Sequence, residues 1–470
     1  MSKDIIHIKE IILKAAQNAI QETGNEPEPE LTKKIDWPIK CSVGPGLEGA
    51  IACESKIGYV NGSKGWLVYR GYNIFDLCAY SNFEEVSFLL LHGRLPNSCE
   101  LETYKQKLIN YGNLNKTLRL LMAFPVEKMH VMAALRLGTN LMRQEFTILD
   151  TEEGKPDIND AIASDEDSIA METIPFGSNH AVYEFDKQDT RWFKKTKAEE
   201  KARQSIDSIG FEACYHLIAG VSVIVAAISR IHSGKLPLEP NPDLSFAGNL
   251  LYMISGKIPS PIEERIMDIS LILHADHGMN ASTFASMVVA STLSDIFFSV
   301  GAGIGALSGP LHGGANEAVI KSLQEIERAD NVKTWLDKKM INKEKISGFG
   351  HRVYKAYDPR ARILGPLAQF LANNSPAIMP IYDVACELEK QMISKLGAEK
   401  KIFPNVDFYS GIVYSCLGID SKLFTPLFAA SRVAGWTARI YEYIQNNRIF
   451  RPRAIYTGEF NKKYLPVSMR

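Results

Sequence analysis

The chain has 470 residues, of which 46% are hydrophobic and 23% charged, and its formal net charge is −1. This length exceeds the ~100–200 residues of a usual domain and excludes a small disulfide-stapled scaffold. A net charge near zero gives no overall attraction to nucleic acid or to an anionic membrane, so local basic clusters must hold any anionic ligand. The seven cysteines form no CxxC pair and are odd in number, which argues against a disulfide framework or a zinc site and predicts a cytoplasmic location.

The N-terminal part of the chain is predicted to be largely helical. Residues 4–22 place isoleucines and alanines at helical spacing, and the acids early in this segment are unlike a secretory signal or a transit peptide. Residues 64–72 combine aromatic residues with glycines and predict a short hairpin or turn. Helical patterns return over residues 83–91 and 101–111.

Residues 146–200 interrupt this helical pattern. The stretch is rich in aspartate and glutamate and has little apolar periodicity. We predict a solvated excursion or a partly disordered loop, and a regulatory or partner-binding role is the alternative.

Two apolar segments were tested as membrane spans. Residues 216–229 form a nearly continuous apolar run that is too short to cross a bilayer, so we predict a central core helix. Residues 287–307 are long enough, but Asp295 near the middle would cost ~2.5–3.5 kcal/mol at a bilayer centre. We predict a buried helix there and no membrane association.

Within that second segment, glycine recurs every fourth residue at Gly301, Gly305 and Gly309. One helical face therefore offers almost no side-chain bulk, and another helix can approach closely. The close contact is predicted either within the chain or across a subunit boundary.

Three later segments each place an ionisable residue beside glycines: His312 in 309–316, His351 in 348–351 and Asp407 in 404–411. Glycine lets backbone and substrate approach closely, so three such places indicate an active site more than a packed core. The three residues are far apart in sequence, so only the tertiary fold can bring them together.

These segments resemble the signature of the citrate synthase family. The resemblance covers roughly residues 44–145 and 201–460, and relatives cross the region of residues 146–200 with a shorter connection. Further matching motifs are Gly46–Gly49, Tyr69–Tyr72, Leu89–Pro96, Leu271–His277 and Arg451–Ala454. The resemblance implies a mainly α, two-domain fold. Its expected parts are a large domain of residues 1–313 and 420–470, which includes the acidic insertion at 146–200, and a small mobile domain of residues 314–419.

The resemblance also implies an acyltransferase that converts an acyl group into an alkyl group, with acetyl-CoA, oxaloacetate and water giving citrate and CoA. In this reaction Asp407 is the implied base, His312 stabilises the enolate, and His351 activates the ketone of oxaloacetate. Because one methylene changes selectivity by only ~1–3 kcal/mol, a 2-methylcitrate synthase that uses propionyl-CoA stays open as an alternative.

Substrate-binding residues are carried over from the family in the same way. Arginine suits the two carboxylates of oxaloacetate because its planar fork pairs bidentately with them. The implied oxaloacetate ligands are His277, Arg360, Arg432 and Arg451, and the last of these implies a homodimer in which it reaches the neighbouring site. The implied CoA ligands are Gly348, Gly350 and Lys355; acetyl-CoA is a co-substrate, and no tightly bound cofactor is expected.

Competing readings start from single features. His274 and His277 are three residues apart and could bind metal on one helical face, but no third ligand is evident and we predict no metal. Arg432 and Arg439 are seven residues apart, so an exposed charged helix face could explain both. Residues 301–306 match GxGxxG/A, which suggests a NAD-dependent dehydrogenase, although the βαβ context is missing. A catalytically silent binding protein is the third possibility.

Overall fold

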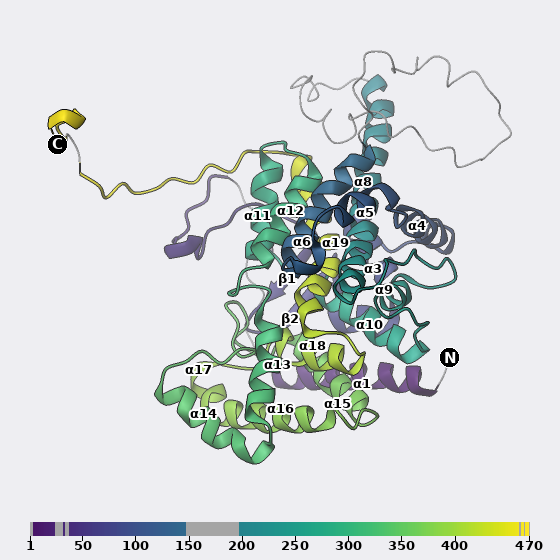
Figure 1. Cartoon of the computed structure of the whole chain (residues 1–470). Helices are drawn as coiled ribbons and strands as arrows, with labels where there is room; N and C mark the ends of the chain where they lie inside the picture. Colours follow the sequence, from purple (N-terminus) through teal and green to yellow (C-terminus); the bar gives the residue numbers. More distant parts are fainter. Residues whose placement is uncertain are drawn as a thin grey trace.

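The computed structural model describes residues 3–23, 32, 37–146, 197–459, 462–464 and 466–469. The protein is mainly α, as predicted (Figure 1). The longer helices are α1 (Lys3–Thr23), α2 (Ile74–Tyr80), α3 (Phe83–His92), α4 (Ser98–Tyr111), α5 (Asn115–Met122), α6 (Val131–Leu141), α8 (Lys197–His232), α9 (Phe246–Ser255), α10 (Pro261–His274), α11 (Ala281–Ser291), α12 (Ile296–Leu307), α13 (Ala315–Ile326), α14 (Val332–Ile341), α15 (Pro359–Ala372), α16 (Met379–Met392), α18 (Val406–Cys416) and α19 (Phe424–Ile444). The shorter turns are η1 (Pro45–Leu47), η2 (Val126–Lys128), η3 (Met142–Phe146), η5 (Ala329–Asn331), η6 (Ile393–Gly397), α17 (Ala398–Lys400), η7 (Ser421–Leu423) and η8 (Val467–Met469).

A small antiparallel sheet has the strand order β1 (Gly58–Asn61), β2 (Trp66–Tyr69) and β3 (Tyr72–Asn73). The hairpin predicted at residues 64–72 is confirmed, and β1 is an additional strand that pairs Gly58 with Tyr69. The helices predicted at 4–22, 83–91 and 101–111 are confirmed as α1, α3 and α4.

Several helices begin where side chains satisfy their free N–H groups. Ser260 accepts from the N–H of Glu263 and the Glu263 side chain accepts from the N–H of Ser260, which forms a capping box ahead of α10. Asn82 and Glu85 form the same box at α3. These local signals fix where α10 begins; the helix ends at His274, beside the candidate site.

The core of the protein is built around α8 and α19, which pack against each other, with α10, α11 and α12 around α19 (Figure 1). Residues 216–229 lie within α8 and are a core helix, as predicted. The apolar part of the helix is longer than this run. Residues Gly210–His232 are long and apolar enough to cross a membrane by length and composition, but 89% of their most apolar window is buried inside the protein.

Residues 287–307 are largely buried, but they belong to two helices, α11 and α12, and not to the single helix predicted. Asp295 is the reason, because its carboxylate caps α12 by accepting from the N–H of Phe297 (2.7 Å) and also accepts from Arg143 (2.6 Å). Within α12, a Cβ on Gly301 would lie 2.3 Å from Oδ1 of Asn140 on α6, so this close contact is within the chain. Gly305 has far more room, with only the Cδ of Arg136 near, at 3.9 Å.

The dehydrogenase reading of residues 301–306 is contradicted. The whole motif and the residues before it lie inside α12, a continuous helix from Ile296 to Leu307. A dinucleotide-binding glycine motif needs a turn between a strand and a helix, and neither the strand nor the turn is present here.

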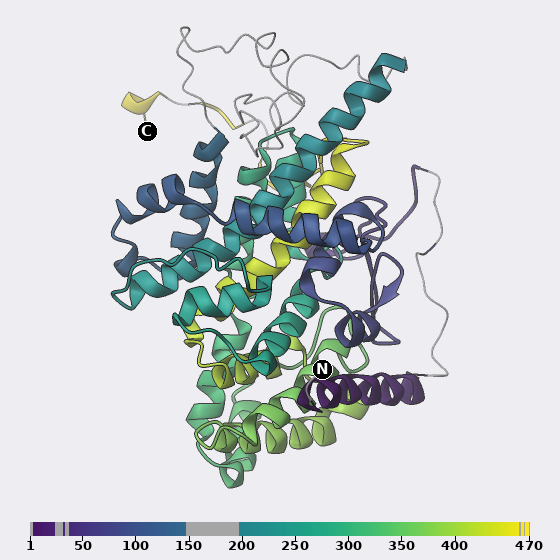
Figure 2. The same cartoon turned by 90° about the vertical axis from the view of Figure 1, so that its right-hand side faces the viewer.

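Helices α13 to α18 lie together at one end of the molecule, below the helices around α8 and α19 (Figure 1). α1 packs against both α2 and α15, and so it touches both groups of helices (Figure 2). Two polar contacts support this placement: Arg362 at the start of α15 pairs with Glu22, and the Lys9 ammonium lies 4.1 Å from the ring centre of Tyr80.

The acidic stretch predicted at residues 146–200 lies almost wholly outside the described residues, which resume at Lys197 with α8. That prediction therefore stays a prediction.

Candidate active site

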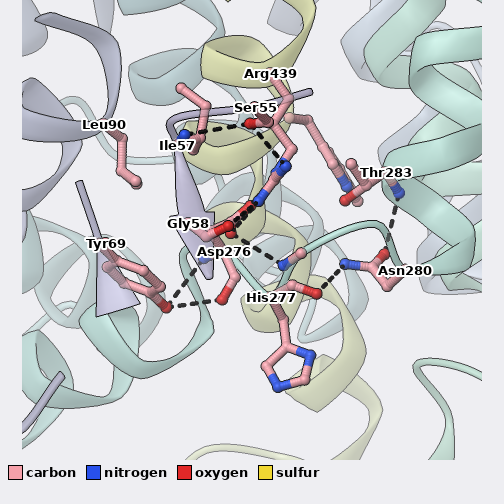
Figure 3. A network of polar contacts seen from close by, with 12 residues as sticks. Ser55, Ile57, Gly58, Tyr69, Leu90, Asp276, His277, Asn280, Thr283 and Arg439 are labelled. Carbon is pink, nitrogen blue, oxygen red and sulfur yellow. Dashed lines mark hydrogen bonds and ion pairs between the residues drawn. The ribbon is translucent and has the colours of Figure 1, made fainter. Parts of the chain in front are cut away.

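The candidate site is organised around the end of α10 and the turn that follows it, residues 274–278 (Figure 3). The Tyr69 hydroxyl lies 2.8 Å from the carbonyl oxygen of Asp276, and the Asp276 carboxylate accepts from Arg439 (2.6 and 2.8 Å) and from the Gly278 N–H (3.1 Å). These contacts hold the turn rigidly and present His277 beyond the helix end. The reading of His274 and His277 as one helical face was therefore wrong, since α10 ends at His274.

His277 and His351 come together in the folded chain. Their ring centres are 5.0 Å apart, and Nε2 of His277 lies 3.2 Å from the hydroxyl of Tyr354, three residues after His351. His277 is buried, and burial together with the positive charge of Arg360 holds its pKa well below the usual value. A neutral His277 is therefore expected at neutral pH.

The backbone fixes the tautomer of His351. Its Nδ1 accepts from the N–H groups of Val353 (3.0 Å) and Tyr354 (3.2 Å), so a neutral ring carries its proton on Nε2. Burial and the nearby Arg360 lower the pKa of His351 to about 4. His351 is thus a neutral hydrogen-bond donor at neutral pH.

His312 is held in a similar way, but through its Nε2 atom and not through Nδ1. It lies in the turns between α12 and α13, and its Nε2 accepts from the N–H of Ser282 (3.3 Å) at the start of α11 and lies 2.8 Å from the Ser282 hydroxyl. The ring proton is then on Nδ1. Burial and the positive charge of Arg432 lower the pKa of His312 to about 4, so this ring is also a neutral donor.

Arg432 is a buried cation with an unused hydrogen-bond donor. It lies on α19, is 1% exposed, and its Nε donates to the carbonyl oxygen of His274 (2.5 Å), but its Nη2 is buried without a partner. The Phe428 ring lies 4.6 Å from the guanidinium and 6.5 Å from the ring centre of His312, which links these two residues. Burial lowers the pKa of Arg432 to about 10, so it stays charged at neutral pH and lacks an anion on one side.

Arg360 begins α15 and is also buried. Its Nε and Nη2 donate to the carboxylate of Asp358 (3.0 and 2.7 Å). Burial lowers the pKa of Arg360, but the Asp358 carboxylate outweighs this effect and raises it. Its Nη1 has no hydrogen-bond partner among the described residues. Its guanidinium lies 5.9 Å from the ring centre of Tyr354, the residue that contacts His277.

Asp407 lies in the first turn of α18, where Asn405 is the N-cap and accepts from the Asp407 N–H (3.0 Å). Its carboxylate makes no hydrogen bond with any residue that the structure describes. Burial raises the pKa of Asp407 from its usual value of 3.8 to about 6, while the charge of Arg360 opposes this shift. The result is a more basic carboxylate that is still ionised at pH 7.

The glycine loop brings the segments of His351 and Asp407 together. The Gly350 N–H donates to Phe403 (2.8 Å), and the Asn405 backbone and side chain donate to the carbonyl oxygens of Gly348 (2.9 Å) and Gly350 (3.0 Å). Gly348 has a φ of 83°, and a Cβ there would lie 3.2 Å from Cα of Phe408. Only glycine combines this conformation with so close an approach.

Two of the predicted site residues are exposed. Lys355 lies close enough for its charge to contribute to the low pKa of His351. Arg451 is not brought to this place, because it is on an extended segment that follows α19 and leads away from the helices (Figure 1). The predicted ionisable residues His277, His312, His351, Arg360, Arg432 and Asp407 are connected through the contacts and charge effects described above. Gly348 and Gly350 form the loop that joins the segments of His351 and Asp407.

Sequence reasoning missed several residues that support the site, namely Tyr354, Ser282, Asp358 and Phe428. Only Asp358 carried a usable signal, because Asp followed by Pro is a typical helix start. The alternative of an exposed charged face for Arg432 and Arg439 is contradicted, since they are 1% and 3% exposed and Arg439 is paired with Asp276. In the described part of the chain, no three histidine, cysteine or acidic residues are grouped so that they could hold a metal ion.

Comparisons with known proteins identify the family to which the chain belongs. The family model "Citrate synthase, C-terminal domain" matches residues 46–453. A citrate synthase from Acidithiobacillus ferridurans is 39% identical over 433 residues, which cover 91% of this chain and 98% of that protein. A citrate/2-methylcitrate synthase from Bacillus subtilis is 35% identical, covering 88% of this chain and 96% of that protein.

Two solved structures have the same fold. Citrate synthase from Pyrobaculum aerophilum aligns with a TM-score of 0.75 and 36% identity, over 93% of this chain and 100% of that one. Citrate synthase from Thermoplasma acidophilum, in a ternary complex with carboxymethyl coenzyme A and oxaloacetate, aligns with a TM-score of 0.75 and 31% identity. This alignment covers 91% of this chain and 100% of that one. The class of protein is therefore an enzyme of the condensing, transferase type. The chain belongs to the citrate synthase family.

Proposed function

We propose that this protein is a citrate synthase that condenses acetyl-CoA with oxaloacetate and hydrolyses the product to citrate and CoA. The observation that carries the proposal is the pair of neutral imidazoles, His312 and His351, each fixed by backbone N–H groups so that its other nitrogen can donate. The basic carboxylate of Asp407 belongs to the same neighbourhood. A weak carbon acid needs this combination of one base and two donors.

The first step removes a proton from the methyl group of acetyl-CoA. A carboxylate with a pKa of about 6 is a better base than an ordinary aspartate, because desolvation raises the energy of its charge. The thioester oxygen becomes negative as the proton leaves, and the Nδ1–H of His312 donates to it. A neutral donor suits this role because the positive charge of an imidazolium would lower the pKa of a nearby carboxylate and make it a weaker base.

The second step joins the methylene carbon of the enolate to the ketone carbon of oxaloacetate. The ketone oxygen becomes an alkoxide, and the Nε2–H of His351 donates to it. The same site then hydrolyses the thioester of citryl-CoA, in which water attacks the thioester carbon and CoA leaves as the thiol.

Oxaloacetate is held by its two carboxylates. The unpartnered Nη2 of buried Arg432 supports a role for this residue, since a buried cation without an anion is costly until a ligand supplies one. Arg360 contributes through Nη1 while Asp358 fixes its orientation, and His277 contacts the same substrate from the 274–278 turn.

For CoA we propose Lys355 together with the glycine loop. Lys355 is exposed, as a residue that meets the phosphates of a large substrate has to be. A Cβ at Gly350 would meet only Ile402, at 3.9 Å, so this glycine leaves open space beside the site. Its N–H is already used by Phe403, and we therefore assign it room for CoA and not a hydrogen bond.

The assembly is a homodimer in this proposal, with Arg451 of one subunit completing the site of the other. Its exposure on an extended segment outside its own site supports this. The domain division is proposed as residues 1–313 with 420–470 and residues 314–419, with closure on oxaloacetate, and the location as the cytoplasm.

Complementation tests the shared site. Arg451→Met and Asp407→Asn each remove one essential group, so each variant alone should be inactive. Refolding the two together should restore about a quarter of wild-type activity, because half of randomly paired dimers are mixed and each has one intact site. Absence of recovery in proven mixed dimers would contradict the shared site.

The central experiment measures release of free CoA in the presence of oxaloacetate, with acetyl-CoA and propionyl-CoA compared side by side. We expect kcat/KM to favour acetyl-CoA by about tenfold or more, within the ~10–200-fold that one methylene can supply. A preference for propionyl-CoA would instead make the protein a 2-methylcitrate synthase. No turnover with either thioester would contradict the proposal and favour a silent binding protein.

A further inference from the structure

Two arginines on one face of α19 reach the same turn but use their donors differently. Arg432 and Arg439 are two helical turns apart, and both are buried, at 1% and 3% exposure. Arg432 holds the turn through the carbonyl oxygen of His274 and keeps Nη2 unpartnered. Arg439 holds it through both oxygens of Asp276 (Figure 3).

The pair between Asp276 and Arg439 is tightly enclosed. A Cβ on Gly435, which lies between the two arginines on α19, would be 2.2 Å from the carbonyl oxygen of Ala275. A Cβ on Gly58 would be 2.5 Å from Oδ2 of Asp276. Asp276 is fully buried, so its carboxylate is shielded from bulk water and depends on the protein for its partners.

Asp276 also affects Arg432. The Asp276 carboxylate raises the pKa of Arg432 against the effect of burial, and Arg432 in turn contributes to the low pKa of Asp276. Arg432 and Arg439 thus both interact with the Asp276 carboxylate, but this carboxylate is hydrogen-bonded only to Arg439. The excess positive charge stays on Arg432.

We propose that Arg439 is a positioning residue that reserves Arg432 for the substrate. It saturates the Asp276 carboxylate, which is the internal anion that otherwise competes with a substrate carboxylate for the free donor of Arg432. This inference rests on the proposed function, in which Arg432 binds oxaloacetate. It adds a residue that touches no substrate but sets how strongly the substrate is bound.

The test compares Arg439→Gln with the double variant Arg439→Gln/Asp276→Asn. The single change leaves the Asp276 charge without its partner, so Arg432 is drawn to it and the KM and Kd for oxaloacetate rise about tenfold, within the range of coupled neighbours. The double change removes both charges and keeps an amide pair, so KM and Kd return to within about threefold of wild type. At saturation kcat stays within about threefold in both, since neither residue touches the reacting atoms.

Arg439→Lys is the matched control, because it keeps a cation beside Asp276 and is expected to bind oxaloacetate nearly as wild type does. Calorimetric titration of oxaloacetate without acetyl-CoA gives Kd, and thermal melting verifies that each variant is folded. If Arg439 has only a structural role, the double variant binds as poorly as the single one, which would overturn the inference. If the single variant does not fold, the double variant decides alone. A rise of about tenfold in its Kd would contradict the inference, and a Kd close to the wild-type value would support it.

The wild-type protein separates this inference from the proposed function. A wild type that neither binds nor turns over oxaloacetate fails the proposed function. A wild type that does both, together with an Arg439→Gln variant of unchanged Kd, fails only the inference about Arg439.

Discussion

Replacing the proposed base by its amide, Asp407→Asn, is the most informative single change. A pKa raised from 3.8 to about 6 is about two units, which is worth about 3 kcal/mol of extra driving force for proton transfer at 1.36 kcal/mol per unit. The amide has no comparable basicity. We expect kcat to fall by about 10²–10⁴, the usual contribution of a general base, while the Kd for oxaloacetate changes little.

The same change should stabilise the fold, and the direction depends on pH. The folded pKa of Asp407 lies above its unfolded value, so the stability associated with its protonated form is present below pH 3.8 and is lost as the pH rises through about 6. At pH 7 the ionised carboxylate costs up to about 3 kcal/mol, and we take about 1–3 kcal/mol because the side chain is only partly buried. Asp407→Asn removes this cost at pH 7 and gives no gain near pH 4.

Free-thiol release measures kcat, calorimetry measures oxaloacetate binding, and melting at pH 4 and pH 7 measures stability. Asp383→Asn on α16 is the matched control, since it makes the same chemical change at an exposed carboxylate. Near-normal turnover in Asp407→Asn would refute the assignment of the base. A loss of stability at pH 7 would refute the claim that burial, and not an internal ion pair, governs this carboxylate.

Three further outcomes are expected. The plot of log kcat/KM against pH should rise up to about pH 6 as Asp407 ionises and then level off. A further step near pH 7 would mean that a histidine titrates there, which would contradict the two neutral imidazoles. Arg360→Lys should raise the KM for oxaloacetate about tenfold or more, because a single ammonium cannot both pair with Asp358 and keep a donor for the substrate; an unchanged KM counts against the clamp. Gly348→Ala should lower both kcat and the melting temperature. Gly418 shares the positive φ (73°) but has no atom within 4 Å of an added Cβ, so Gly418→Ala should lower only the stability, by about 1 kcal/mol. Equal kcat values in these two variants would contradict a role for the close approach at Gly348.

The sequence predicted the helical class and the placement of several helices because their apolar spacing and caps are local signals. α3 illustrates this, with Asn82 and Glu85 forming a capping box ahead of an apolar run. The split of residues 287–307 into two helices was missed, although the cause is local. An aspartate in an apolar run was weighed as a cost in a membrane and not as the N-cap of a new helix.

The candidate site was predicted through glycine-flanked residues and family resemblance, and its electrostatics could not be. The neutral state of His312 depends on the backbone N–H of Ser282, thirty positions away in the chain. The burial of Arg439 depends on a turn that follows α10. Its separation of seven residues from Arg432 fits an exposed helix face equally well. Such contacts follow from packing between helices, which residue spacing does not encode.

The position of α1 bears on how the protein is prepared for any of these measurements. This helix touches both α2 and α15, so a change in the angle between the two helix groups must slide or release one of its two contact surfaces. A purification tag joined ahead of Lys3 would sit at that junction, and one fused to the other terminus would follow the segment that carries Arg451. Rate constants should therefore be compared between tagged and cleaved material before any variant is interpreted.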